Sequence, residues 1–148
     1  MGTKRVGWAR IKSLINENQN QLKIRNEQII SVGAAETKTL TANDSGALVY
    51  LGGAGVATAT LPAVAAGLNF KFYVTSAQVH IINGGANVIQ GSYIHSTNKT
   101  GFAHVAITNK ATLTLHSTHP AIGDYLEFSC NGTNWYVNGV TNNAITQG

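Results

Sequence analysis

Residues 123–139 read GDYLEFSCNGTNWYVNG, and this stretch decides the fold class. Asn131-Gly132 lies between two runs of aromatic and β-branched residues. Asn-Gly favours a two-residue type I′ turn, because both central residues of that turn need a positive φ. Such a turn predicts a β-hairpin with these cross-strand pairs: Cys130 with Thr133, Phe128 with Trp135, and Leu126 with Val137.

The two faces of this hairpin differ in polarity, since side chains alternate along a strand. One face is nearly all apolar: Leu126, Phe128, Cys130, Thr133, Trp135 and Val137. The other is mostly polar: Tyr125, Glu127, Ser129, Asn134, Tyr136 and Asn138. A slip of one residue would destroy this sorting, so we expect one half-buried hairpin of an antiparallel sheet.

Upstream of the hairpin, short β segments follow one another with turn clusters between them. Pro62 in LPAVAAG (61–67) cannot continue a central strand, so we expect a loop or one short helical turn there. So many strands without intervening helices predict an all-β domain over residues 33–148, an antiparallel β-sandwich or jelly-roll-like fold. The expected strands are 37–42, 47–52, 56–61, 68–75, 78–83, 87–90, 102–108, 111–116, 124–130 and 133–138.

The N-terminal segment has a different pattern. Apolar residues at helical spacing predict a helix from residue 4 to about residue 30, within an arm that spans 1–32. Its polar middle, NENQNQ (16–21), favours a division into a short amphipathic helix and a less stable turn. The arm either self-associates as a coiled coil or docks on another surface. The residues that define the apolar spacing are Trp8, Ile11, Leu14, Ile15 and Leu22.

The charge is sparse and uneven. Only 11% of the 148 residues are charged, against a typical ~25%. Residues 1–30 hold six Lys or Arg and two Glu, a difference of +4, which equals the net charge of the chain. A basic arm suits an acidic partner surface, nucleic acid or simple solvation. The neutral β domain shows no basic groove interleaved with aromatic residues, so we expect no nucleic-acid partner.

The sequence also limits the chemistry and the compartment. One cysteine excludes an intrachain disulfide, no apolar run is as long as a membrane helix, and no signal peptide is visible. Asp124 and Glu127 are a poor acid–base pair, and inward-facing Cys130 suits packing better than thiol catalysis. We therefore expect no enzyme activity, no membrane partner and no cofactor.

The five histidines do not form a clear metal-binding motif. A site within one chain, or one shared between subunits on a symmetry axis, remains an alternative to ordinary surface or hydrogen-bonded histidines. We expect no metal. The five are His80, His95, His104, His116 and His119.

Three segments together resemble virion proteins of tailed bacteriophages. They are LTANDSGALVYL (40–51), TATLPAVAAGLNFKFYV (58–74) and the opening stretch. The pattern is similar to that of capsid decoration (cement) proteins, head fibres and some tail-fibre modules. It covers roughly residues 38–139. Cys130-Asn131 departs from it, because Asp-Gly is commoner there.

The resemblance implies a capsid decoration protein, assembled in the bacterial cytoplasm and carried on the virion surface. It also implies a homotrimer that binds the major capsid protein. The alternative is a phage fibre or a receptor- or carbohydrate-binding module, in which Tyr93, Tyr125 and Tyr136 would stack on sugars. The capsid contacts expected on the arm are Lys4, Arg5, Trp8, Arg10, Ile11, Lys12 and Ile15.

Overall fold

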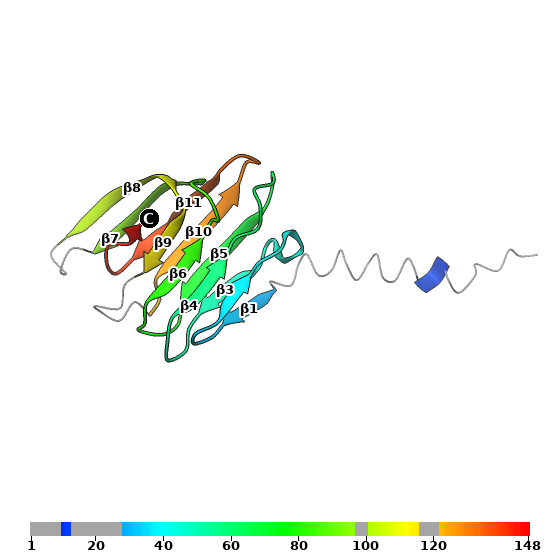
Figure 1. Ribbon diagram of the computed structural model, residues 1–148, viewed down its shortest axis with the longest axis horizontal. Coiled ribbons are helices and arrows are strands. Elements are labelled where there is room, and N and C mark those ends of the chain that lie inside the picture. The colour runs from blue at the N-terminus through cyan, green and yellow to red at the C-terminus, as the bar shows by residue number, and fades with distance from the viewer. Residues whose placement is uncertain (1–9, 13–27, 97–100, 116–121) are drawn as a thin grey trace, which may run out of the picture.

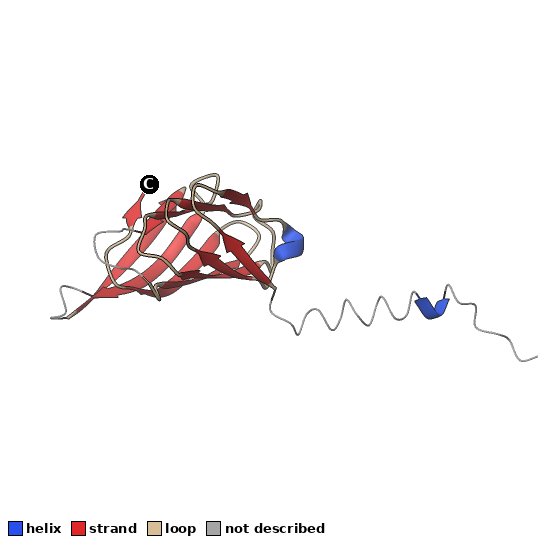
Figure 2. Ribbon diagram, turned by 90° about the horizontal axis from the view of Figure 1, so that it is seen from below, coloured by secondary structure: helices blue, strands red, loops and turns tan. Residues whose placement is uncertain are grey.

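A computed structural model describes residues 10–12, 28–96, 101–115 and 122–148. Their strands form two sheets, and Figure 2 shows these sheets as two layers. The fold is therefore all-β, as the sequence predicts. Among the described residues, no helix is long and apolar enough to cross a membrane.

The larger sheet has seven strands in the order β1-β3-β5-β10-β11-β7-β8 (Figure 1). Strands β1, β3 and β5 run parallel to one another, and β11 and β7 are also parallel. The other neighbours in this sheet are antiparallel. The strands are β1 (Ile29–Val32), β3 (Leu48–Leu51), β5 (Asn69–Val74), β7 (Ile89–Ser96), β8 (Phe102–Lys110), β10 (Tyr125–Cys130) and β11 (Trp135–Thr141).

The smaller sheet has five strands in the order β12-β9-β6-β4-β2. Strands β2, β4 and β6 are parallel, whereas β9 is antiparallel to both of its neighbours. A short 3-10 helix, η1 (Ala42–Asp44), connects β2 to β3. The strands are β2 (Thr37–Thr39), β4 (Ala57–Thr60), β6 (His80–Asn83), β9 (Thr112–Leu115) and β12 (Thr146–Gln147).

The prediction of an antiparallel sandwich is wrong in one respect, because both sheets are mixed. From β1 to β6 the chain alternates between the two sheets, so β3, β4, β5 and β6 each enter their sheet beside an earlier strand and run in the same direction as that strand. Only the later strands, β8 to β12, add antiparallel neighbours. The jelly-roll description is not confirmed.

The hairpin is present, but its predicted register is wrong by two residues. Cys130 pairs with Trp135, and Phe128 with Val137. The side-chain Oδ1 of Asn131 accepts hydrogen bonds from the backbone N–H groups of Thr133 and Asn134, both at 2.9 Å. This asparagine turn closes a four-residue loop in place of the two-residue turn. A shift of two keeps every strand residue on its predicted face, although Thr133 now lies exposed in the loop.

The predicted helix is wrong at its C-terminal end, where the chain forms strand β1. Ile29–Val32, which we assigned to the arm, form a strand parallel to β3. Alternating burial, with Ile30 and Val32 inward, fits a β-strand better than a helical face. Residues 10–12 are helical, and the rest of the predicted helix up to residue 27 lies outside the described residues.

All ten predicted strands coincide with observed ones, with shifted ends. The strand expected over 87–90 continues to Ser96, because the chain passes Gly91 in a β-bulge and does not turn there. Gly91 has a φ of 130°, and the backbone of Val137 lies where a Cβ would be, so a side chain would not fit.

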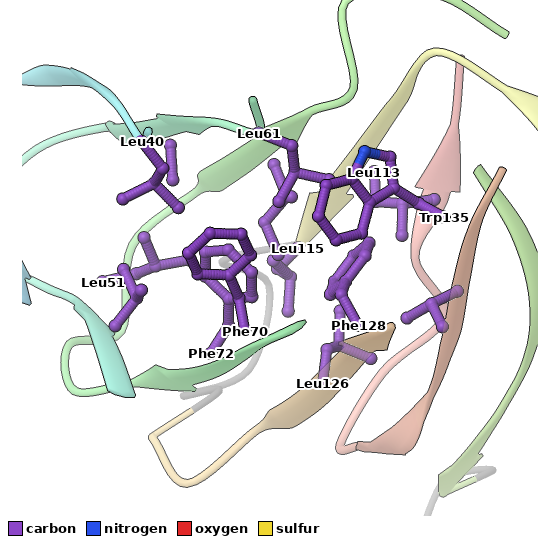
Figure 3. Packing of buried hydrophobic residues seen from close by; sticks show 14 of the residues in the cluster. Leu40, Leu51, Leu61, Phe70, Phe72, Leu113, Leu115, Leu126, Phe128 and Trp135 are labelled. Carbon is purple, nitrogen blue, oxygen red and sulfur yellow. The ribbon is translucent and has the colours of Figure 1, made fainter. Parts of the chain in front are cut away.

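The core lies between the sheets, and both contribute to it. Figure 3 shows Leu61, Leu113 and Leu115 close to the aromatic residues of the larger sheet. The Phe70 and Trp135 rings are 5.7 Å apart, and those of Phe72 and Phe128 meet edge to face at 5.3 Å. Offset and edge-to-face pairs of this kind add stability beyond their buried area.

One histidine belongs to this core. His80 is fully buried, its Nδ1 accepts the N–H of Ala57 at 3.3 Å, and its Nε2 faces the hydroxyl and carbonyl oxygens of Ser76. Burial lowers the pKa of His80, and the Ser76 backbone opposes that effect. The imidazole is therefore held neutral, with its proton on Nε2.

Candidate functional site

The outward side chains of the seven-stranded sheet form the candidate site, which we call the outer face. Strand pairing sorts them into rows that cross the sheet. One row runs through the middle strands with aromatic and aliphatic side chains, and a neighbouring row is polar over β5, β10 and β11. The first row is Ser31, Tyr50, Tyr73, Tyr125, Val140, Ile94 and His104; the second is Ile29, Leu48, Lys71, Glu127 and Asn138.

Three tyrosines stand side by side in the first row. The ring centroids of Tyr50 and Tyr73 are 6.3 Å apart, and those of Tyr73 and Tyr125 are 4.7 Å apart. All three side chains are partly exposed. Directly opposed aromatic side chains stabilise a sheet, and here they also give its outer face an amphipathic ridge.

A depression of about 310 Å³ lies on the outer face over β5, β10 and β11. In its lining, Lys71 Nζ and a carboxylate oxygen of Glu127 form an ion pair at 3.7 Å, with side chains 42% and 39% exposed. Such an exposed pair adds little stability. Small and amide side chains make the depression possible, since bulkier ones would fill it. Its lining is Asn69, Phe70, Lys71, Glu127, Phe128, Ser129 and Asn138.

The Tyr125 hydroxyl is coupled to this ion pair. Burial raises the pKa of Tyr125 above its ordinary value, and the hydrogen bond to Glu127 and the charge of Glu127 raise it further. The phenol therefore stays protonated. Glu127 therefore lies between the Lys71 ammonium and the protonated Tyr125 phenol two residues before it on β10.

The other end of the outer face, over β11, β7 and β8, carries three exposed apolar side chains, with the imidazole of His104 opposite Ile94. Val140 is 53% exposed, Ile94 is 41% exposed and Phe102 is 79% exposed. Val140 and Ile94 are direct neighbours across β11 and β7, and Phe102 lies beside Ser96 at the start of β8. We call these three residues the apolar patch. Strand β8 is also the edge of its sheet.

The residues expected to stack on sugars do not all lie together. Tyr125 and Tyr136 are on the outer face, but the expectation for Tyr93 is wrong. Tyr93 is 2% exposed and points into the core, where its hydroxyl accepts the N–H of Ile145 at 2.8 Å. It holds the C-terminal segment against β7 and is not available to a ligand.

Three further residues of the site were not singled out from the sequence, and all three lie on β5 (NFKFYV, 69–74). Phe70, Phe72 and Val74 are buried. The period-two alternation therefore turns Asn69, Lys71 and Tyr73 outward, and this is the signal that could have found them.

Of the expected capsid contacts, Arg10, Ile11 and Lys12 are described, and all three are exposed on one helical turn. Lys4, Arg5, Trp8 and Ile15 lie outside the described residues.

The groups considered for catalysis or metal binding lie apart. Glu127 faces outward, whereas Asp124 is 6% exposed and its Oδ1 accepts the N–H of Asn142 at 2.7 Å. Cys130 is buried. Within the described part of the chain, no three His, Cys, Asp or Glu side chains gather as a metal site would require. His116 and His119 lie outside that part.

Asp124 gives the domain a testable pH dependence. Burial raises its pKa from 3.8 to about 6, and the hydrogen bond from Asn142 only partly opposes this. The folded state therefore binds the proton more tightly than the unfolded chain. Stability from the protonated carboxyl is fully present below pH 3.8 and is lost as the pH rises through about 6. Above that pH the ionised group costs up to about 3 kcal/mol.

At pH values above about 6, we expect Asp124→Asn to be more stable than the native protein. At pH values below 3.8, we expect it to be equally stable or less stable. The amide oxygen can still accept the Asn142 N–H, and it carries no charge. Urea unfolding at pH values on both sides of the two pKa values checks this. His80 titrates in both proteins, so the difference between them isolates Asp124. If the free energies of unfolding of the two proteins changed in parallel with pH, burial would not raise the pKa of Asp124.

Comparison with known proteins gives no relative: no protein-family model, curated protein or solved structure matches the chain.

Proposed function

We propose that this chain is a non-enzymatic capsid decoration protein of a tailed bacteriophage, carried on the outer surface of the virion and assembled in the host cytoplasm. The observation that carries the proposal is the apolar patch of Ile94, Phe102 and Val140 beside the edge strand β8. An uncharged surface of this kind is typical of the centre of a protein interface. The three-segment resemblance to virion proteins supports the same function.

In this proposal the β domain forms a homotrimer through the apolar patch. The three side chains of the patch carry no charge that would lose its hydration in an interface. A second copy that pairs with β8 or covers it would also protect the unpaired backbone groups of this edge strand. A second copy of the same chain is the partner that is present wherever the protein is made. Light scattering on the full chain measures this stoichiometry, and a monomer at micromolar concentration would contradict it.

The arm supplies the attachment to the major capsid protein. It holds the entire positive excess of the chain, and Arg10 and Lys12 are exposed. Opposite charges on the capsid would steer its approach, while apolar side chains such as Ile11 would hold it once bound.

We expect reversal of both arm charges, Arg10→Glu with Lys12→Glu, to weaken binding to heads stripped of this protein. It should slow association and make the rate less salt-sensitive, because steering acts on the encounter. Co-sedimentation and surface-plasmon kinetics with purified heads measure both effects. The matched control is the same reversal at Lys38 and Lys110 of the β domain, which should leave binding unchanged. Equal losses from the two pairs would mean that the arm is not the specific contact.

A phage fibre or receptor-binding module is the second candidate, and one observation favours it: the polar depression beside the tyrosines on the outer face. Copy number separates the two functions. Electron cryo-microscopy of the particle should show decoration proteins in many copies over the head and a fibre tip in only a few.

A further inference from the structure

The depression on the outer face combines polar groups of both kinds in a small space. Its volume of about 310 Å³ is at the lower end of the ~300–1,000 Å³ usual for ligand sites. Lys71 donates, Glu127 accepts, and the amides of Asn69 and Asn138 do both. This set matches a ligand whose polar groups each donate and accept, and hydroxyl groups have that property.

The charges in the depression cancel. Lys71 and Glu127 form an ion pair with each other, so the site presents strong hydrogen-bonding groups without a net charge. Glu127 would repel a phosphate or carboxylate ligand, and Lys71 would repel a cationic one. An uncharged ligand can bind both groups and leave the pair intact.

Aromatic rings flank the depression on two sides. Tyr136 is paired with Ser129 of the lining and is 41% exposed, and its hydroxyl accepts the Asn131 side-chain amide at 3.5 Å. On the other side Tyr73 and Tyr125 lie two residues along the same strands from Lys71 and Glu127. Aromatic faces bind the C–H face of a sugar ring, while polar groups between them bind its hydroxyls.

The site is also largely preformed. Glu127 is paired with Lys71, and all the lining residues belong to three central, hydrogen-bonded strands or their ends. A ligand would therefore order few side chains on binding.

From these observations we propose that the depression binds an uncharged pyranose unit of a glycan. Glu127, Lys71 and Asn138 bind its hydroxyls, and Tyr136 contacts its apolar face. The site involves neither the arm nor the apolar patch, so it is independent of attachment to the capsid.

NMR titration of the ¹⁵N-labelled full chain tests the proposal. The probes are glucose, galactose, mannose, rhamnose and N-acetylglucosamine, each added alone. We expect at least one sugar to give saturable shifts at the amides of residues 69–71, 127–129 and 138. If none shifts these amides, or if the shifts lie elsewhere, the proposal is wrong.

Two matched pairs of variants then assign the roles. Glu127→Gln keeps the shape of the side chain but loses the charge, and we expect it to weaken sugar binding about tenfold, whereas Glu36→Gln, on an exposed turn, should not change it. Tyr136→Ala should weaken binding by a similar factor of about ten, whereas Phe102→Ala, which removes a ring that is 79% exposed and lies away from the depression, should not.

The same variants distinguish this site from a protein interface. Light scattering and binding to stripped heads are measured on Glu127→Gln and Tyr136→Ala. Loss of sugar binding with oligomer and head binding intact supports the glycan site. Loss of oligomer or head binding instead would mean that a protein covers this face, and would overturn the proposal without affecting the capsid function.

Discussion

Trp135→Ala is expected to destabilise the domain by about 3–5 kcal/mol, the usual effect of removing a large aromatic side chain from a core. Trp135 is fully buried at the start of β11, and its ring packs against Phe70 from β5. Figure 3 shows it next to Leu61 and Leu113, the first from the loop after β4 and the second from the smaller sheet. Its loss would leave a cavity that the two rigid sheets cannot close.

Urea unfolding, followed by circular dichroism, measures this change. A small domain has a total stability of about 5–15 kcal/mol, so the variant should unfold at a much lower urea concentration. Trp135→Phe is the first control. The indole Nε1 has no hydrogen-bond partner among the described residues, so this change removes volume without breaking a hydrogen bond, and it should cost much less.

Tyr136→Ala is the second control, because it removes a neighbouring ring from the opposite face of β11. In the monomer this ring is 41% exposed, and its loss should cost under about 1 kcal/mol. If both alanine variants lost stability equally, the outer face would be buried in the assembled protein, and the hairpin would lie inside the oligomer.

The hairpin shows what sequence reasoning can and cannot predict. Alternation of apolar and polar residues was enough to assign every strand side chain to its face, since burial has a period of two. It was not enough for the register, because a shift of two residues preserves the same faces. The shift depends on hydrogen bonds from the Asn131 side chain to two backbone N–H groups. An Asn-Gly pair permits both loops, so the sequence alone does not choose between them.

The sequence contains a repeat that corresponds to two of the parallel strands, and the predictions above did not use it. TKTL (37–40) recurs as TATL (58–61), 21 residues later, since 58 minus 37 is 21. In the fold these are β2 and β4, which pair in parallel with Thr37 beside Thr58. Leu40 and Leu61, which follow them, are both buried. A repeat of this length fits a chain that visits each sheet in turn, and it could have indicated the mixed topology.

The depression could be predicted only in part. Alternation places Lys71 and Glu127 on the outer sides of their strands, 56 residues apart by subtraction. It does not show that β5 and β10 are neighbours, or that the two residues lie directly opposite each other. Strand order depends on contacts between distant segments, which local periodicity does not record. The same limit explains Tyr93, whose partner is the backbone of Ile145.

Removal of residues 1–32 should destabilise the domain far more than removal of residues 1–27. The longer deletion takes away β1, with the buried side chains of Ile30 and Val32. At about 1.5–3 kcal/mol for each buried aliphatic side chain, the loss is about 3–6 kcal/mol, before the loss of backbone hydrogen bonds to β3. It also turns β3, whose Val49 and Leu51 are fully buried, into an unprotected sheet edge.

The shorter deletion keeps Gln28, whose carbonyl accepts the N–H of Leu48 at 2.8 Å, and should unfold at the same urea concentration as the full chain. Unfolding of both truncations side by side measures the difference. Equal stability of the 1–32 deletion and the full chain would show that β1 is not part of the sheet. The comparison also decides how the arm can be tested for capsid binding: a protein lacking residues 1–32 would fail through misfolding, whereas one lacking 1–27 would fail only if the arm itself makes the contact.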